Sequence, residues 1–282
     1  MTGLLKFSRI KLQWWKLLPL LIPVVLLLGS GIGFTLLQSL DTADAYRQAV
    51  QLPGLWRNLL FSLYVAAVST ALSVLLGTTL AYLIRRLPAV YRRRGVGLLV
   101  PLILPYIAVG FLVLLWFGQT GILASLAESA GLGGWYHSPL FRGDGIGIIL
   151  GYVYKSTPFV LILVFPILRR IPDGYLQTAR MLGAGELRTF CQVVLPRLLP
   201  GMYSAAIIIF VFSFGGYDLP FVVGESRPRM ISLYAYRLYF ARPVGERPIA
   251  AAVLMLVLAI GIAAVLLYAR AVRGIEDRER RL

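Results

Sequence analysis

Residues 58–84 read NLLFSLYVAAVSTALSVLLGTTLAYLI, and this run establishes the class of protein to which the chain belongs. It contains no Asp, Glu, Lys or Arg, whereas Arg57 precedes it and Arg85 follows it. A helix needs about 20 mainly apolar residues to cross the hydrocarbon core of a bilayer. The run therefore predicts a transmembrane helix rather than a helix of a water-soluble domain.

The composition of the whole chain agrees with this prediction. Of its 282 residues, 59% are hydrophobic and 14% are charged, and the mean hydropathy is +0.79. A soluble domain carries about 25% charged residues, so a water-soluble globular protein and a disordered chain are both excluded. One cysteine, Cys191, and one histidine, His137, exclude a disulfide framework and a metal cluster built from these residues. We expect Cys191 to be buried and unreactive.

Five other stretches match residues 58–84 in length and apolar content. The six expected spans are residues 17–38, 58–84, 95–117, 146–168, 199–223 and 249–269. We therefore expect an all-α membrane protein with six transmembrane helices. The expected parts of the chain are an N-terminal segment with the first span and an outer loop (1–57), a core (58–270) and a tail (271–282).

The basic residues indicate on which side of the membrane each loop lies. Nineteen of the 28 Lys and Arg residues occur in the N-terminal segment, in the loops after spans two and four, and in the tail. Eight occur on the opposite side, and Lys155 lies inside a span. Basic loops remain on the cytoplasmic side, so both termini are predicted to be cytoplasmic. This arrangement explains the net charge of +16 without a nucleic-acid partner.

The inner segment between spans four and five, residues 169–198, contains a short helical pattern from Tyr175 to Leu182. Gly183 then suits a left-handed helix end. The side chains expected to share one face of this helix are Tyr175, Leu176, Ala179 and Leu182. An isolated helix of about two turns is unstable in water, so it must pack against its own membrane domain, the lipid surface or a partner.

A second inner helix is predicted from Glu186 to Leu195. Pro196 is expected to end it, and Pro200 to open the fifth span. On this interpretation the short helix is a rigid element bounded by Gly183 and Pro196, able to transmit a movement to spans four and five.

The residues of this segment follow a specific pattern: Gln177-Thr178-Ala179, then Gly183, then Val193-Val194-Leu195-Pro196. The pattern resembles the EAA motif of the permease (transmembrane) subunits of binding-protein-dependent ABC importers. The branch that it resembles transports spermidine and putrescine, thiamine, iron or sulfate, and the resemblance extends over 58–270. Gln177 stands where the motif has Glu, and Thr178 where it has Ala. Docking by shape is therefore expected here in place of an ion pair at position 177.

The resemblance implies a permease subunit of an ATP-driven importer in a bacterial cytoplasmic (inner) membrane, with the core 58–270 as its permease domain. The inner helix would be a cytoplasmic coupling helix that docks on a separate ABC ATPase, which would bind the ATP and Mg²⁺. A second permease chain, identical or related, and a solute-binding protein would complete the assembly. The ATPase-coupling residues would be Tyr175, Leu176, Gln177, Thr178, Ala179, Leu182, Gly183, Ala184, Leu195 and Pro196.

The chain has no G-x-x-x-x-G-K-[ST] phosphate loop, so we expect no ATPase activity and no bound cofactor. A self-sufficient secondary transporter or channel is the alternative function, and it needs ion-coupling groups inside the spans. A membrane enzyme acting on lipid is a third possibility, but it lacks a cluster of catalytic side chains. For the solute, a polyamine-like molecule is our first expectation, while Lys155 before Pro158-Phe159 also resembles carbohydrate permeases.

Two charged residues fall within the expected spans, Lys155 in the fourth and Asp218 in the fifth. Such charges are costly in lipid, so they either pair with each other or line the solute path, unless Lys155 extends its ammonium to the membrane surface. Gly215 and Gly216 are expected to loosen the fifth helix, and Pro220 to end or kink it. The candidate path residues are Lys155, Gly216, Tyr217 and Asp218.

Overall fold

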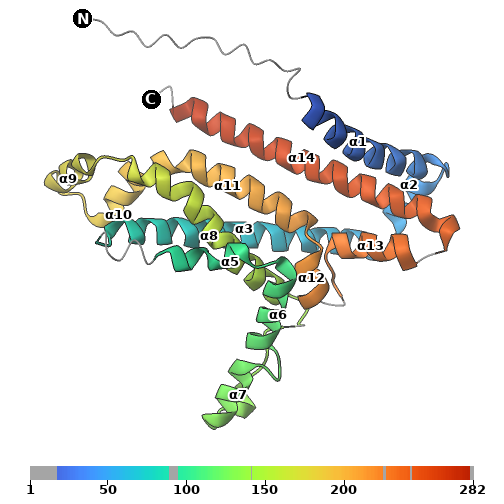
Figure 1. Cartoon of the computed structure of the whole chain (residues 1–282), viewed down its shortest axis with the longest axis horizontal. Coiled ribbons are helices and arrows are strands. Elements are labelled where there is room, and N and C mark those ends of the chain that lie inside the picture. The colour runs from blue at the N-terminus through green and yellow to red at the C-terminus, as the bar shows by residue number, and fades with distance from the viewer. Residues whose placement is uncertain (1–17, 89–94, 141, 225–226, 242, 280–282) are drawn as a thin grey trace, which may run out of the picture.

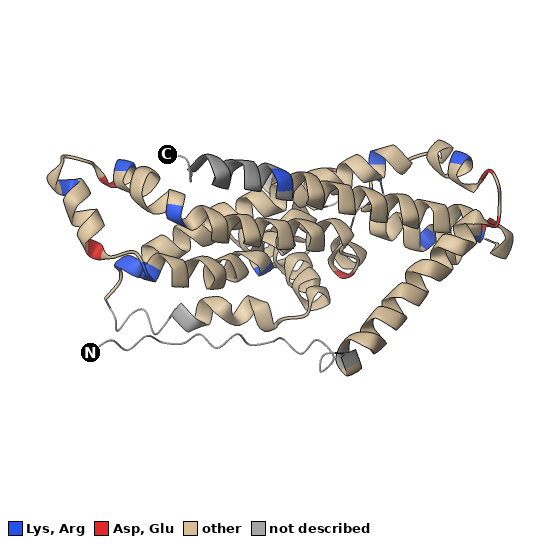
Figure 2. Cartoon of the chain, turned by 90° about the horizontal axis from the view of Figure 1, so that it is seen from above, with Lys and Arg blue, Asp and Glu red and all other residues tan. Residues whose placement is uncertain are grey.

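The computed structural model describes residues 18–88, 95–140, 142–224, 227–241 and 243–279 (Figure 1). Within these ranges the chain is helical and contains no β-strand. Six of the described helices are long and apolar enough to cross a membrane, which confirms the predicted all-α membrane fold. In Figure 2, most charged residues lie toward the two ends of the long helices, and the middle is largely uncharged, as a lipid environment requires.

Five long helices correspond to expected spans, four of them (all but α11) with closely matching limits. They are α1 (Leu18–Leu40), α3 (Leu55–Arg86), α8 (Ile146–Arg169), α11 (Leu195–Gly215) and α14 (Arg247–Glu279), and the third span is built from α6 (Tyr106–Phe117) and α7 (Ile122–Ser129). Short helices connect them: α2 (Ala45–Gln51), α5 (Val100–Ile103), α9 (Asp173–Met181), α10 (Glu186–Thr189), α12 (Asp218–Val223) and α13 (Ile231–Ala241). Single 3₁₀ turns occur at Gly95–Leu99, Gly133–Trp135 and Val244–Glu246.

Helix α3 is central and packs along both α8 and α11. Its buried positions are rich in small side chains, including Ser69, Ser73 and Ala81. At Gly77 the helices approach so closely that an added Cβ would lie 2.5 Å from the Cβ of Val160 in α8. Small residues allow membrane helices to pack backbone against backbone, so these positions set the spacing of the core.

Helix α1 lies outside this core and packs mainly on α14 (Figure 1). Its large apolar side chains are exposed, with Leu26 at 64% and Leu27 at 74%. Apolar side chains exposed along a helix of this length face lipid. The first span is therefore a peripheral helix.

The third span differs from the continuous helix expected over 95–117. Helix α5 ends at Ile103, and α6 begins at Tyr106. Pro105 lacks an N–H group and forces the residue before it out of the helical conformation, and Leu104 is accordingly extended (φ −67°, ψ 133°). Figure 1 shows α6 and α7 turning away from α5 and projecting from the helix bundle.

The fifth span also differs from its expected limits, because Pro196 does not end the second inner helix. The chain continues from α10 through a π-helical turn at Phe190–Val194 into α11. A wider π turn relieves the clash that a proline ring makes with the carbonyl one turn earlier. Cys191 lies on this turn and is exposed, so the expectation that it is buried is wrong.

At its outer end the fifth span breaks where the glycine pair predicts. Helix α11 ends at Gly215, and α12 begins again at Asp218. Pro220 lies in the first turn of α12, where a missing N–H group costs no helical hydrogen bond, so it does not end the helix. The break leaves the backbone of Gly216 and Tyr217 outside any helix.

Candidate functional site

The inner loop carries a short helix with the predicted glycine end. Helix α9 is followed by Gly183 in the left-handed conformation (φ +81°). The Gly183 N–H donates to the carbonyl of Arg180 (2.9 Å), and the Ala184 N–H donates to that of Ala179 (3.0 Å). These two bonds form the usual glycine-terminated helix end. The loop reverses direction at this point and leads into α10.

The tip of the loop exposes large apolar side chains. Met181 is 87% exposed, Leu182 82% and Leu187 77%. Figure 1 places α9 at the extreme end of the molecule, beyond the ends of α3 and α8. Exposed apolar side chains gathered in this way are typical of a surface that contacts another protein or a membrane.

The face predicted for the short helix is divided between two environments. Leu176 turns inward and packs against the core formed by the inner halves of α3, α8 and α11. Tyr175 is exposed, and the guanidinium of Arg197 lies 4.1 Å above its ring. The other predicted coupling residues are distributed along the same segment: Gln177, Thr178 and Gly183 are exposed, and Ala179, Ala184, Leu195 and Pro196 are half-buried. Leu195 and Pro196 belong to α11 and lie away from the tip.

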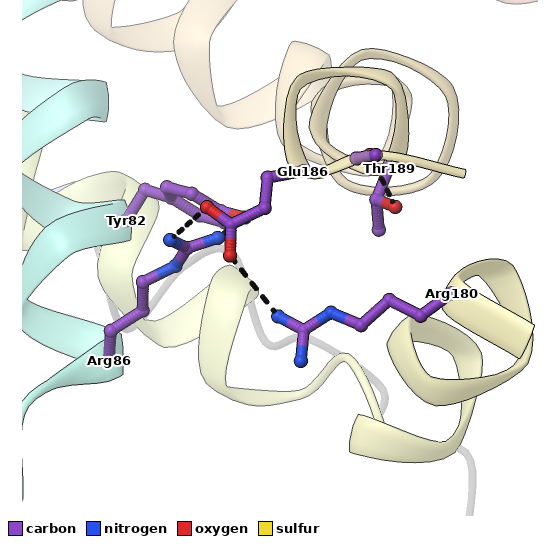
Figure 3. A network of polar contacts seen from close by, with 6 residues as sticks. Tyr82, Arg86, Arg180, Glu186 and Thr189 are labelled. Carbon is purple, nitrogen blue, oxygen red and sulfur yellow. Dashed lines mark hydrogen bonds and ion pairs between the residues drawn. The ribbon is translucent and has the colours of Figure 1, made fainter. Parts of the chain in front are cut away.

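An ion-pair network connects this loop to the end of α3 (Figure 3). Arg86 Nη1 lies 2.7 Å from Glu186 Oε2, and Arg180 Nη2 lies 3.6 Å from the other carboxylate oxygen. Arg86 Nη2 also donates to the hydroxyl of Tyr82 (2.6 Å). The Tyr82 ring in turn packs edge-on against Phe190, with a centroid separation of 4.8 Å.

The neighbouring arginine contacts the other side of the loop. Arg85 Nη2 donates to the carbonyl of Ile171 (2.7 Å) and to Asp173 Oδ1 (2.8 Å). The Arg85 side chain is only 12% exposed, whereas Asp173 is 81% exposed. The sequence predicts only a topological role for the arginines after span two, and these ion pairs are found in the structure alone. The acidic residue at the start of each inner helix, Asp173 and Glu186, is the signal that could have indicated them.

Lys155 lies midway along α8 and contacts the break in the third span. Its ammonium donates to the carbonyls of Pro101 and Leu102 (3.3 Å each) and to that of Leu104. It also lies 4.7 Å from the centre of the Tyr106 ring. An ammonium has three donors, so the interrupted helix satisfies all of them.

These contacts describe where Lys155 lies relative to the expected alternatives. The side chain is 9% exposed and does not extend to the membrane surface. Among the described residues, no ion pair joins it to Asp218, which is exposed at the start of α12. Lys155 nevertheless borders a cavity of about 180 Å³, together with Ser156, Tyr106, Phe159, Ile208 and Phe212.

The outer break at Gly216 is connected to the lining of this cavity through two tyrosine rings. Tyr106 packs edge-on against Tyr152, with centroids 6.0 Å apart, and the Tyr152 hydroxyl lies against Gly216, where it leaves no room for a side chain. The Gly216 carbonyl accepts a hydrogen bond from Ser232 Oγ (2.6 Å). Tyr217 is half-buried between Phe221 and the Tyr236 ring. The four predicted path residues thus lie at two helix breaks that aromatic side chains connect.

Comparison with known proteins agrees with this architecture. The family model described as "binding-protein-dependent transport system inner membrane component" matches residues 73–277. The molybdenum transport permease ModB of Mycobacterium tuberculosis is 29% identical over 216 residues, covering 76% of this chain and 78% of that protein. The spermidine/putrescine permease PotB of Escherichia coli is 24% identical over 240 residues, covering 77% and 80%.

A solved structure shares the fold at lower sequence identity. A chain of a bacterial ABC transporter that imports the acidic polysaccharide alginate superposes with a TM-score of 0.75 and 19% identity, over 94% of this chain and 96% of that one. The family model covers most of the chain, and it includes the inner loop and both helix breaks. The chain therefore belongs to the family of inner-membrane components, or permeases, of binding-protein-dependent ABC transport systems.

Proposed function

We propose that the loop from Asp173 to Thr189 is the surface on which a separate ATPase docks, so that ATP hydrolysis on that partner drives movement of the permease. The observation that carries this proposal is the exposed apolar tip of Met181, Leu182 and Leu187 on a glycine-capped helix. The tip lies beyond the ends of α3 and α8 (Figure 1), which supports a partner outside the bundle. In this arrangement ATP and Mg²⁺ bind to the partner, and both termini of this chain lie in the cytoplasm.

Co-purification with the ATPase subunit tests the docking surface. Replacing Leu182 by Asp places a charge in the apolar tip, so we expect the permease to lose its bound ATPase while remaining folded. Val244→Asp is the matched control, because Val244 is 68% exposed and lies in the segment between α13 and α14, at the opposite end of the long helices. Equal recovery of the ATPase with wild type and Leu182→Asp would contradict the docking proposal.

We propose that the solute path runs past the two helix breaks. It passes the cavity beside Lys155 at one break and the exposed Asp218 at the other, and a second permease chain completes it. Broken helices that expose backbone groups to a cavity are a recurring element of transporters. Lys155 then acts chiefly by holding the break at Leu104 open, while Gly216, Tyr217 and Asp218 border the outer half of the path.

The solute is proposed to be a small molecule delivered by a binding protein. The assembled complex in liposomes tests this with three probes that are the named cargo of related permeases: molybdate, spermidine and diacetylchitobiose. ATP-dependent accumulation of one probe identifies the class. Accumulation driven by an ion gradient in the absence of the ATPase would instead establish a self-sufficient transporter.

A further inference from the structure

Two adjacent arginines at the inner end of α3 contact opposite ends of the inner loop. Arg85 contacts Ile171 and Asp173, just before and at the start of α9, and Arg86 contacts Glu186 at the start of α10. Successive residues of an α-helix are separated by about 100° around the axis, so neighbouring side chains point in different directions. The two side chains therefore contact the inner loop on either side of α9, Arg85 at its start and Arg86 at the start of α10.

Apart from Leu176, which packs on the inner core, and Tyr175, whose ring lies against Arg197 of α11, helix α9 has few other attachments to the membrane domain. None of its residues is fully buried, and its main packing is against α10 and the π-helical turn. The ion pairs of Arg85 and Arg86 are thus direct polar connections between α3 and this loop. Because α3 packs extensively on both α8 and α11, a displacement of the loop that reaches α3 also reaches the centre of the bundle.

Arg86 is held in position by its own helix. Tyr82 lies one turn earlier, accepts a hydrogen bond from Arg86 Nη2, and is fixed in turn by the Phe190 ring of the π-helical turn. Figure 3 shows the Arg86 guanidinium next to the Tyr82 ring and joined to the Glu186 carboxylate. A long side chain restrained on two sides loses less conformational freedom on forming its ion pair.

The exposure of these ion pairs indicates that they affect the position of the inner loop more than the folding stability of the protein. The carboxylate partners are largely exposed, at 81% for Asp173 and 63% for Glu186. Exposed ion pairs contribute little to folding stability. What they fix is the angle and distance of the loop relative to α3.

We propose that Arg85 and Arg86 are positioning residues that make α3 move as one unit with the ATPase-docking loop. This inference rests on the proposed function, since it assumes that the loop is displaced by the ATPase. It adds span two to the elements that receive the movement, whereas chain connectivity alone provides only spans four and five.

The experiment measures one distance within the chain in the complete complex, reconstituted in nanodiscs with its ATPase and second permease. Spin labels are placed at Leu83 on α3 and Arg188 on α10, in a Cys191→Ser background, because both positions are exposed and neither takes part in the three ion pairs. Pulsed electron spin resonance compares the nucleotide-free complex with the complex trapped by MgATP and vanadate.

For the wild type we expect a single narrow distance peak that is the same in both states. With Arg86→Gln or Glu186→Gln the peak should broaden and shift on trapping, and the double variant should resemble each single one, because both remove the same pair. Arg170→Gln is the control, since it removes one positive charge from an exposed residue at the inner end of α8. It should leave the wild-type peak unchanged.

A distance that changes with nucleotide in the wild type would overturn the inference, and so would a narrow, unchanging peak in Arg86→Gln. The ATPase content of each sample is measured in parallel. Absence of the ATPase from the wild-type complex would count against the docking proposal itself, and this outcome is distinguishable from a failure of the arginine contacts.

Discussion

Lys155 shows how a charged group is stabilised at mid-depth in this bundle. Its ammonium donates to three carbonyls that the break in the third span leaves without helical partners. The partial negative charge at the end of a helix favours a cation, and the Tyr106 ring adds an attraction to its face. The charge and the exposed backbone thus satisfy each other, and neither is left unpaired in an apolar environment.

Replacing Lys155 by Met should therefore destabilise the protein. The three carbonyls would lose a charged donor, and a buried polar group left unsatisfied costs about 1–3 kcal/mol. We expect a lower thermal midpoint in detergent, measured by differential scanning fluorimetry. Ser156→Ala is the control, because Ser156 borders the same cavity without donating to these carbonyls. An unchanged midpoint for Lys155→Met would show that the carbonyl contacts contribute no stability.

Among the helices, the two breaks are maintained by different means. At Leu104 a proline removes an N–H group, and a lysine from another helix occupies the freed carbonyls. At Gly216 two glycines end the helix, and Tyr152 fills the space where a side chain would be. Helix α8 supplies both Lys155 and Tyr152, so one span supports the breaks in two others.

The bend between α5 and α6 is predicted to depend on Pro105. In Pro105→Ala the new N–H group can bond to the Pro101 carbonyl one turn earlier, in competition with Lys155, and the helix should straighten. Spin labels at Val100 and Leu126, both exposed, should then move farther apart in a Cys191→Ser background. Pro166→Ala is a suitable comparison, because α8 runs unbroken through Pro166. The same distance in wild type and Pro105→Ala would show that packing alone holds the bend.

For the molecule as a whole, the distribution of basic loops predicts the orientation in the membrane, with both termini in the cytoplasm. The single cysteine of the chain provides a natural probe, because Cys191 is exposed on the π-helical turn next to the inner loop. A membrane-impermeant maleimide should label Cys191 in inside-out vesicles and leave it unmodified in intact spheroplasts. A Val244→Cys, Cys191→Ser chain should show the opposite pattern. Labelling of Cys191 from the outside would reverse the assigned orientation.

Local chemistry was sufficient for much of this protein. The length of an apolar run fixes a spanning helix, and a glycine after a short helix fixes a left-handed end, so the spans at α1, α3, α8 and α14 and the end at Gly183 were predictable. The identity of the family was likewise predictable, because the inner-loop pattern is contiguous in the chain. The break after Leu104 has a local cause in Pro105, but proline also occurs inside unbroken α8, so its effect depended on the surroundings.

Contacts between residues far apart in the sequence could not be predicted in this way. Lys155 meets a carbonyl 51 residues away, and Arg86 meets a carboxylate 100 residues away. Several carboxylates and free carbonyls were chemically suitable for each cation, and nothing in their spacing distinguished Asp218 from the backbone at Leu104. The packing of α5 and α6 on α8 brings the carbonyls near Lys155, because a polar partner is useful only where helix geometry places it within about 3 Å. The sequence alone therefore determines the membrane spans and the inner loop. Only the tertiary structure determines which partners Lys155 and Arg86 contact, because packing of the helices brings distant groups together.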